Sequence, residues 1–189
     1  MATDPDGRSL RGIRNRERIA EALFELIEEG TLVPTAEQVA SRAEVSTRSV
    51  FRHYEDMDGL FAEIARRLRD ETLPALETPA GSLPDRIRTV VANRARIFER
   101  IARFKRAGET QRWRSPFLQE HHEALAAELR GALVLYLPEL AEGGPQRTEI
   151  ADLLTSFEAW DRMRTLQGLD PEEAAATLVS ALRQLLQLG

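Results

Sequence analysis

A stretch near the N-terminus, TAEQVASRAEVSTRSVFRHY (35–54), constrains the fold of this chain more than any other. It predicts two short helices joined by a tight turn. Thr35 is a good N-cap residue, and Gln38 completes a capping box for a helix over residues 36–42. Ser46 can cap a second helix over residues 47–53. The break between them falls on residues 44–46, so the stretch indicates where both helices begin.

The second of these helices has one thin apolar side. Val50 and Tyr54 are four residues apart and therefore share a face. The other faces carry mostly polar side chains, namely Thr47, Arg48, Ser49 and Arg52. Arginine can donate two hydrogen bonds to guanine N7 and O6, so such a helix suits a DNA major groove. A pair of arginines on its own is more often an ordinary solvated pair of charges, and the interpretation depends on the surrounding residues.

The surrounding residues follow the order of a known family. Residues 45–60, VSTRSVFRHYEDMDGL, resemble the pattern V-S-x-x-T-L-Y-x-H-F-x-x-K-x-x-L of the TetR family of repressors. Helix caps, apolar positions and their order agree together. The resemblance covers roughly the first 65 residues, whereas the rest of the chain is similar to the family only in its helix layout.

Three positions depart from the family pattern. Glu44 stands at the usual turn glycine, so the first helix must end without a residue that adopts positive φ freely. Phe51 lacks the hydroxyl of the usual tyrosine, which family members direct at phosphate. Met57 replaces a lysine and removes a phosphate contact. These changes bear on the strength of backbone anchoring more than on the motif itself.

The resemblance implies a set of DNA-contacting residues in and just before the second helix of the motif. They are Thr35, Ser46, Thr47, Arg48, Ser49, Phe51, Arg52, His53 and Tyr54. It also implies a homodimer on a near-palindromic double-stranded DNA operator. The function expected from the resemblance is that of a ligand-responsive repressor with an unknown small-molecule effector.

Composition and charge limit the other possibilities. The chain has 189 residues and no cysteine, which excludes disulfides and cysteine-ligated zinc. The net charge is -5, yet five arginines against three acidic residues up to Arg18 give that segment a net charge of +2. Glu55, Asp56 and Asp58 follow the motif and weaken any broad basic field, so we expect few phosphate contacts. No signal segment or membrane-spanning run occurs, and we expect a cytoplasmic protein without membrane contact.

Apolar residues recur at helical spacing throughout the chain, which predicts an all-α fold. Residues 1–9 are polar and are expected to form a disordered arm. Arg8 and Arg11 could reach a minor groove from this region, although solvation is the simpler interpretation. A three-helix helix-turn-helix domain with a linking fourth helix is expected over residues 10–73, and a proline- and glycine-containing boundary follows it.

A C-terminal ligand-binding and dimerisation domain is expected over residues 82–189. Its predicted helices span residues 82–105, run from Pro116 until Pro138, and cover residues 147–167 and 171–188, with a break at Gly108 and a loop over 141–146. The last helix has a wide apolar face with nothing after it, which indicates a partner. By resemblance the last two helices form the dimer interface, with Leu153, Phe157, Leu178, Leu182, Leu185 and Leu186.

The resemblance also implies a cavity in this domain for a small, often apolar ligand. The candidate residues are Phe98, Phe104, Trp113, Phe117, His121, Phe157 and Trp160. Individually, such side chains are more simply explained as ordinary core. Arg94, His121 and His122 could add polar contacts.

No motif for catalysis, a cofactor or a metal site is found. His121 and His122 point about 100° apart on a helix, and no cysteine is available to complete a site. We therefore expect no enzyme, no cofactor and no metal. The alternative function is a helical interaction or ligand-carrier protein that no longer reads DNA, which Phe51, Met57 and the acidic residues of segment 55–58 favour.

Overall fold

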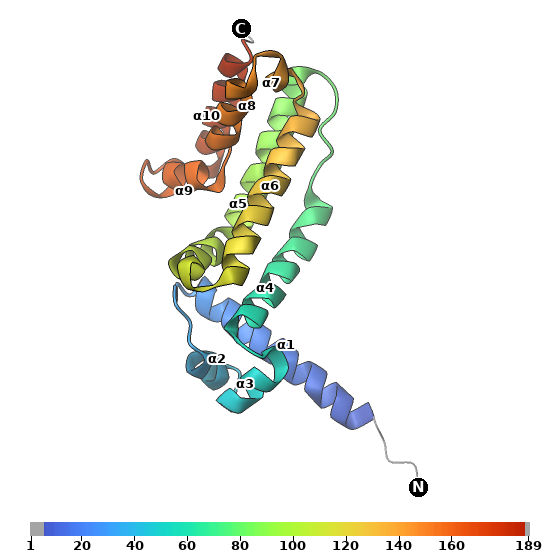
Figure 1. Cartoon of the computed structure of the whole chain (residues 1–189), viewed down its shortest axis with the longest axis vertical. Coiled ribbons are helices and arrows are strands. Elements are labelled where there is room, and N and C mark those ends of the chain that lie inside the picture. The colour runs from blue at the N-terminus through green and yellow to red at the C-terminus, as the bar shows by residue number, and fades with distance from the viewer. Residues whose placement is uncertain (1–5, 188–189) are drawn as a thin grey trace. The chain divides into compact units, whose positions relative to one another are not determined.

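The structure is a computed structural model that describes residues 6–187, with side chains from residue 10 onward. These residues form α-helices and two short 3₁₀ helices, and this part of the chain contains no strand (Figure 1). The predicted all-α class is confirmed. None of the helices in the described range has the length and apolar character that a bilayer span requires.

The helices follow one another in short steps along the chain. They are α1 (Asp6–Glu28), α2 (Ala36–Arg42), α3 (Thr47–Tyr54), α4 (Met57–Thr72), η1 (Leu73–Ala75), α5 (Leu83–Gln111), η2 (Arg112–Arg114), α6 (Pro116–Tyr136), α7 (Glu139–Glu142), α8 (Pro145–Leu154), α9 (Phe157–Thr165) and α10 (Pro171–Leu185).

The chain divides into two compact units. The first unit contains the described residues up to Asp70 together with Arg103–Gln119, and the second contains Glu71–Ala102 and the residues from Glu120 on. This division differs from the predicted one, because the C-terminal third of α5, η2 and the start of α6 pack with the N-terminal helices. The Phe104 ring lies 5.6 Å from the Phe61 ring, and the Arg103 guanidinium donates a hydrogen bond of 2.6 Å to the Glu28 carbonyl.

The first helix begins earlier than predicted. Residues 6–9 were expected to belong to a disordered arm, but α1 starts at Asp6; residues 1–5 lie outside the described residues. No proline follows Asp6 to stop the helix. Arg8 and Arg11 are therefore helical, so a flexible arm entering a minor groove is not available at these positions.

The first unit is organised around a small core to which all four N-terminal helices contribute. Its buried side chains include Ile19, Leu23 and Ile27 from α1, Val39 from α2, Val50 from α3, and Leu60, Ile64 and Leu68 from α4. The apolar residues that recur at helical spacing in α1 and α4 thus face this core. These short helices are held by burial of apolar surface, since helices of seven or eight residues are marginal alone.

Two helix boundaries differ from the prediction. Gly108 does not end α5, which continues to Gln111; glycine inside a helix costs only about 1 kcal/mol, and packing offsets it. The predicted helix over residues 147–167 is two helices, α8 and α9. Between them, Thr155 Oγ1 donates to the Ala151 carbonyl and Ser156 Oγ accepts from the Ala159 N–H, so that Ser156 starts a new helix.

The apolar face of α10 is covered within one protomer. Leu182 is fully buried and Phe157, Leu178 and Leu186 are also buried, in a core that α5, α6, α8, α9 and α10 share. Helices earlier in the chain already cover these four predicted interface residues, and their role at a dimer interface stays a prediction. Leu185 is partly buried against the same core, whereas Leu153 is 69% exposed.

Candidate nucleic-acid interface

The two helices of the helix-turn-helix begin as predicted. The Thr35 N–H donates to Gln38 Oε1 at 2.8 Å, and the Gln38 N–H donates to Thr35 Oγ1 at 3.2 Å, which completes the capping box of α2. Ser46 Oγ accepts from the Ser49 N–H at 3.2 Å and caps α3. Local capping thus fixes the starting point of α3.

The turn between α2 and α3 contains a residue with left-handed backbone. Glu44 has φ of 51°, the conformation that glycine adopts without a steric penalty. Its carboxylate Oε2 lies 2.9 Å from the Arg18 guanidinium of α1. The ion pair connects the turn to α1 and offsets the negative charge of Glu44 next to the start of α3.

The accessible face of α3 carries Arg48, Phe51 and Arg52, all exposed, with Thr47 half-buried beside them. Two other predicted DNA contacts, Ser49 and Tyr54, are buried in the protomer. Ser49 is only 8% exposed and Tyr54 only 4% exposed, because both lie on the side of α3 that packs into the core. The Ser49 hydroxyl instead accepts a hydrogen bond of 3.0 Å from Arg52. Ser49 therefore orients the Arg52 side chain but is not itself part of the exposed face of α3.

The remaining predicted positions differ in their environment. Thr35 and Ser46 are exposed, and their oxygens accept the capping hydrogen bonds. His53 is half-buried, and its Nε2 is buried without a hydrogen-bond partner among the described residues. Burial, followed by the nearby Arg52 and Arg16 charges, lowers the pKa of His53. We infer that neutral His53 packs at the edge of the core and contributes little to an accessible surface.

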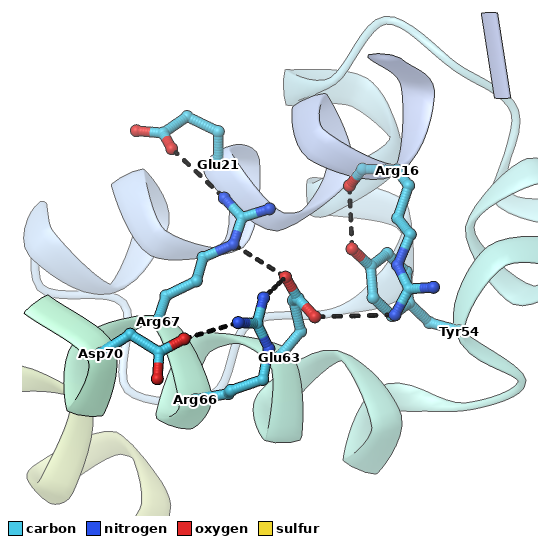
Figure 2. Close-up of polar contacts among 7 residues, drawn as sticks. All are labelled: Arg16, Glu21, Tyr54, Glu63, Arg66, Arg67 and Asp70. Carbon is cyan, nitrogen blue, oxygen red and sulfur yellow. Dashed lines mark hydrogen bonds and ion pairs between the residues drawn. The ribbon is translucent and has the colours of Figure 1, made fainter. Parts of the chain in front are cut away.

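A polar cluster fastens α3 to its neighbours (Figure 2). The Tyr54 hydroxyl donates a hydrogen bond of 2.9 Å to the Arg16 carbonyl, and the Arg16 guanidinium lies over the Tyr54 ring, 5.1 Å from its centroid. Glu63 of α4 accepts hydrogen bonds of 2.8 Å from Arg66 and 2.9 Å from Arg67, and it lies 3.6 Å from Arg16. The cluster joins the end of α3 to α1 and α4.

The Glu63 carboxylate is the centre of this cluster. Burial raises the pKa of Glu63, but hydrogen bonds from Arg66 and Arg67 outweigh it and hold the pKa below its usual value. Sequence reasoning missed this cluster. The spacing of Glu63, Arg66 and Arg67 allows local pairs on α4, but nothing in the sequence indicates that Arg16 lies beside them.

The predicted ligand-binding residues are divided between the two units. Phe98, Phe157 and Trp160 pack together in the core of the second unit, with ring centroids of Phe98 and Phe157 5.7 Å apart and of Phe98 and Trp160 6.2 Å apart. The half-buried His121 is in the same unit. Phe104, Trp113 and Phe117 belong to the first unit, where Phe104 is buried and Trp113 is 75% exposed beside Arg114. The seven predicted side chains therefore do not line one cavity within a single unit.

Arg94 is the most deeply buried charged side chain of the second unit in the described range. Its guanidinium donates to the Thr155 carbonyl, and to the Leu129 carbonyl at 2.8 Å. Burial lowers the pKa of Arg94 to about 10, although the Asp152 carboxylate opposes this shift. Arg94 therefore connects α5 to α6 and to the junction between α8 and α9.

An all-helical chain whose N-terminal helices form a capped helix-turn-helix belongs to the helix-turn-helix class of folds. Two solved structures are similar to it. A transcriptional regulator from Rhodococcus sp. Rha1 is 25% identical, with a TM-score of 0.70, over 91% of this chain and 96% of that chain. A TetR family transcriptional regulator from Pseudomonas syringae pv. tomato str. DC3000 is 24% identical, with a TM-score of 0.57, over 91% of this chain and 95% of that chain.

The chain therefore has the fold of the TetR family of transcriptional regulators, and the resemblance predicted from the sequence is confirmed at this level. No family model matches the sequence. A comparison with curated proteins likewise finds no match.

Proposed function

We propose that this protein is a transcriptional regulator that binds a near-palindromic DNA operator as a homodimer, with α3 in the major groove. The observation that carries the proposal is the exposed face of α3, where Arg48 and Arg52 lie beside each other with Phe51 and no acidic residue interrupts the helix. Arginine at such a position can bond a guanine bidentately. The similarity to solved transcriptional regulators over 91% of the chain supports the same function.

Among the predicted interface residues, Leu153 has a largely exposed side chain in the protomer. The exposed side of α8 carries Ile150 and Leu153, which are three residues apart and share a face. The neighbouring α10 has small exposed residues, Ala176, Thr177 and Ser180, on its outer side. Small side chains allow close approach of a partner helix, and Leu153 supplies apolar area. We therefore propose that α8 and α10 pair with their copies in a second protomer.

Regulation by a small-molecule effector is the part of the proposal that rests on the family resemblance alone. An effector releases DNA only if it binds the DNA-incompetent arrangement of the dimer more tightly than the competent one. A compound library screened by thermal shift, followed by titration of each hit into the protein–operator complex, tests this response. A hit that raises the melting temperature without weakening operator binding is a ligand but not an inducer.

The test of the main proposal begins with sheared genomic DNA. Fragments retained by the purified protein are sequenced, and enrichment of an inverted repeat is expected. Gel-shift titrations with that repeat should show that Arg48→Ala and Arg52→Ala each weaken binding by roughly 1–3 kcal/mol if the arginine reads a base. Arg88→Ala, an exposed arginine of the second unit, is the matched control and should bind like the wild type.

The exposed acidic residues Glu55 and Asp56, which directly follow α3, favour a second candidate function. Their carboxylates would repel a phosphate backbone near the end of this helix. In that case the protein is a helical interaction or ligand-carrier protein without specific DNA binding. Recovery of fragments without any shared sequence, and equal weak binding by the three arginine variants, would support this second function.

A further inference from the structure

We propose that the exposed first part of α1 is a second DNA-contacting element, which binds the phosphate backbone beside the groove occupied by α3. The residues concerned are Arg11 and Arg14, both outside the helix-turn-helix. The inference rests on the DNA-binding function proposed above and adds a specific role for a segment that the motif does not include.

The first part of α1 is not held by the core of its unit. Residues 10–18 contain no buried side chain, and Ile19 is the first buried residue of the helix in the described range. Figure 1 shows these turns of α1 extending past α2 and α3. Their surface is therefore accessible, and they contribute little to the packing that stabilises the unit.

Three arginines of α1 share one face of the helix. Arg11, Arg14 and Arg18 are separated by three and four residues, the spacing that aligns side chains along a helix. Arg14 and Arg11 precede Arg18 by about 6 Å and about 10 Å of helix rise. All three side chains are exposed. Together they form a basic stripe on α1.

The contact of Arg18 with Glu44 fixes the direction of this stripe. Glu44 belongs to the turn that ends two residues later at Ser46, the N-cap of α3, and Arg18 lies 2.9 Å from its carboxylate. The face of α1 that carries the basic stripe is thus the face directed toward the start of α3. Arg14 and Arg11 continue from this point along the exposed end of the helix.

The charges near the stripe favour an anion. Arg18 offsets the Glu44 carboxylate, which would otherwise repel a phosphate next to the start of α3. Glu17 is the only acidic residue within residues 10–18. It lies about 100° from Arg18 around the helix and three residues after Arg14, so a single carboxylate stands beside the three guanidinium groups of the stripe. Arginine matches the geometry of a phosphate through paired N–H donors. Backbone phosphates fix register on a duplex and carry no direct sequence information.

The test is the salt dependence of operator binding, measured by fluorescence anisotropy with the inverted repeat recovered from genomic DNA. Each phosphate contact contributes about 0.9 to the slope of log affinity against log salt. A homodimer carries each substitution in both protomers, so the double variant Arg11→Gln/Arg14→Gln should lower this slope by about 3.6. Its preference for the recovered repeat over a scrambled duplex should stay that of the wild type, because no base contact is lost.

Two further variants make the result decisive. Arg88→Gln/Arg162→Gln removes the same charge from exposed residues of the second unit and should leave the slope unchanged. The variant Arg11→Lys/Arg14→Lys keeps both charges, so its salt slope should be close to that of the wild type. Far-UV circular dichroism should show equal helicity in all variants. An unchanged slope in the glutamine variant, or an equal decrease in the control pair, overturns the inference while operator binding by the wild type stands. If the wild-type protein enriches no DNA sequence, the result contradicts the proposed function itself, independently of Arg11 and Arg14.

Discussion

The hydroxyl of Tyr54, at the end of α3, donates a hydrogen bond of 2.9 Å to the carbonyl of Arg16 in α1. The resemblance to the family implies that Tyr54 contacts DNA, but its buried side chain lies at the contact between two helices. Its ring lies under the Arg16 guanidinium, and Arg16 lies 3.6 Å from Glu63 of α4. One side chain thus links the last turn of α3 to the two long helices that support it.

Tyr54→Phe should lower the free energy of unfolding by about 1 kcal/mol, the usual net value of one hydrogen bond. Operator affinity, measured at equal concentration of folded protein, should not change, because the removed oxygen is buried. Chemical denaturation and gel-shift titration provide the two measurements. A stable variant with weakened operator binding would return Tyr54 to the DNA interface.

Glu44→Gly should stabilise the protein relative to Glu44→Ala by about 1 kcal/mol, because glycine adopts positive φ without the steric penalty that any side chain brings. Both variants lose the ion pair with Arg18, which is worth less than about 1 kcal/mol at exposed positions. The difference in stability between the two variants therefore measures the cost of positive φ at position 44. Equal melting temperatures of the two variants would show that the turn relaxes to another conformation.

Gly59→Ala tests the close approach between α3 and α4. Helix propensity predicts a gain of about 1 kcal/mol, but a Cβ at this position would lie 2.6 Å from the Tyr54 carbonyl oxygen. We expect a net loss of roughly 1–3 kcal/mol, as for other overpacked sites. Gly131→Ala in α6 is the matched control, since a Cβ there meets nothing within 4 Å and should stabilise. A gain in both variants would contradict the predicted clash.

Leu153→Asp should convert the dimer to a monomer in sedimentation equilibrium and leave the melting temperature of the monomer almost unchanged, because Leu153 is exposed in the protomer. Leu182→Ala should do the reverse and cost roughly 2–5 kcal/mol of stability, because it opens a cavity in the core. A persistent dimer of the Leu153 variant would exclude this face of α8.

His53 gives the stability of the first unit a defined pH dependence. Its pKa is lowered in the folded state, so the unfolded chain binds the proton more readily. Stability should be fully present above the unfolded pKa of about 6.5 and should decrease as the pH falls from there toward the folded pKa. His53→Gln should show a smaller decrease between about pH 7.5 and 5.5 in urea denaturation. Parallel curves for the two proteins would exclude His53 as the cause.

The sequence by itself determined the local features of this protein. The caps at Thr35 and Ser46 and the outward position of Arg48 and Arg52 all follow from spacing along a single helix. These features depend on residues three or four positions apart, so they can be predicted from the local sequence alone.

Tertiary structure alone decided which apolar and polar side chains meet across distant helices. Leu182 and Leu153 look alike in a stripe of leucines, yet one is buried by helices of the same protomer and the other is exposed. The hydrogen bond between Tyr54 and Arg16 and the ion pair between Arg18 and Glu44 join residues far apart in the chain. Burial depends on how much surface the rest of the molecule covers, and no local pattern contains that information.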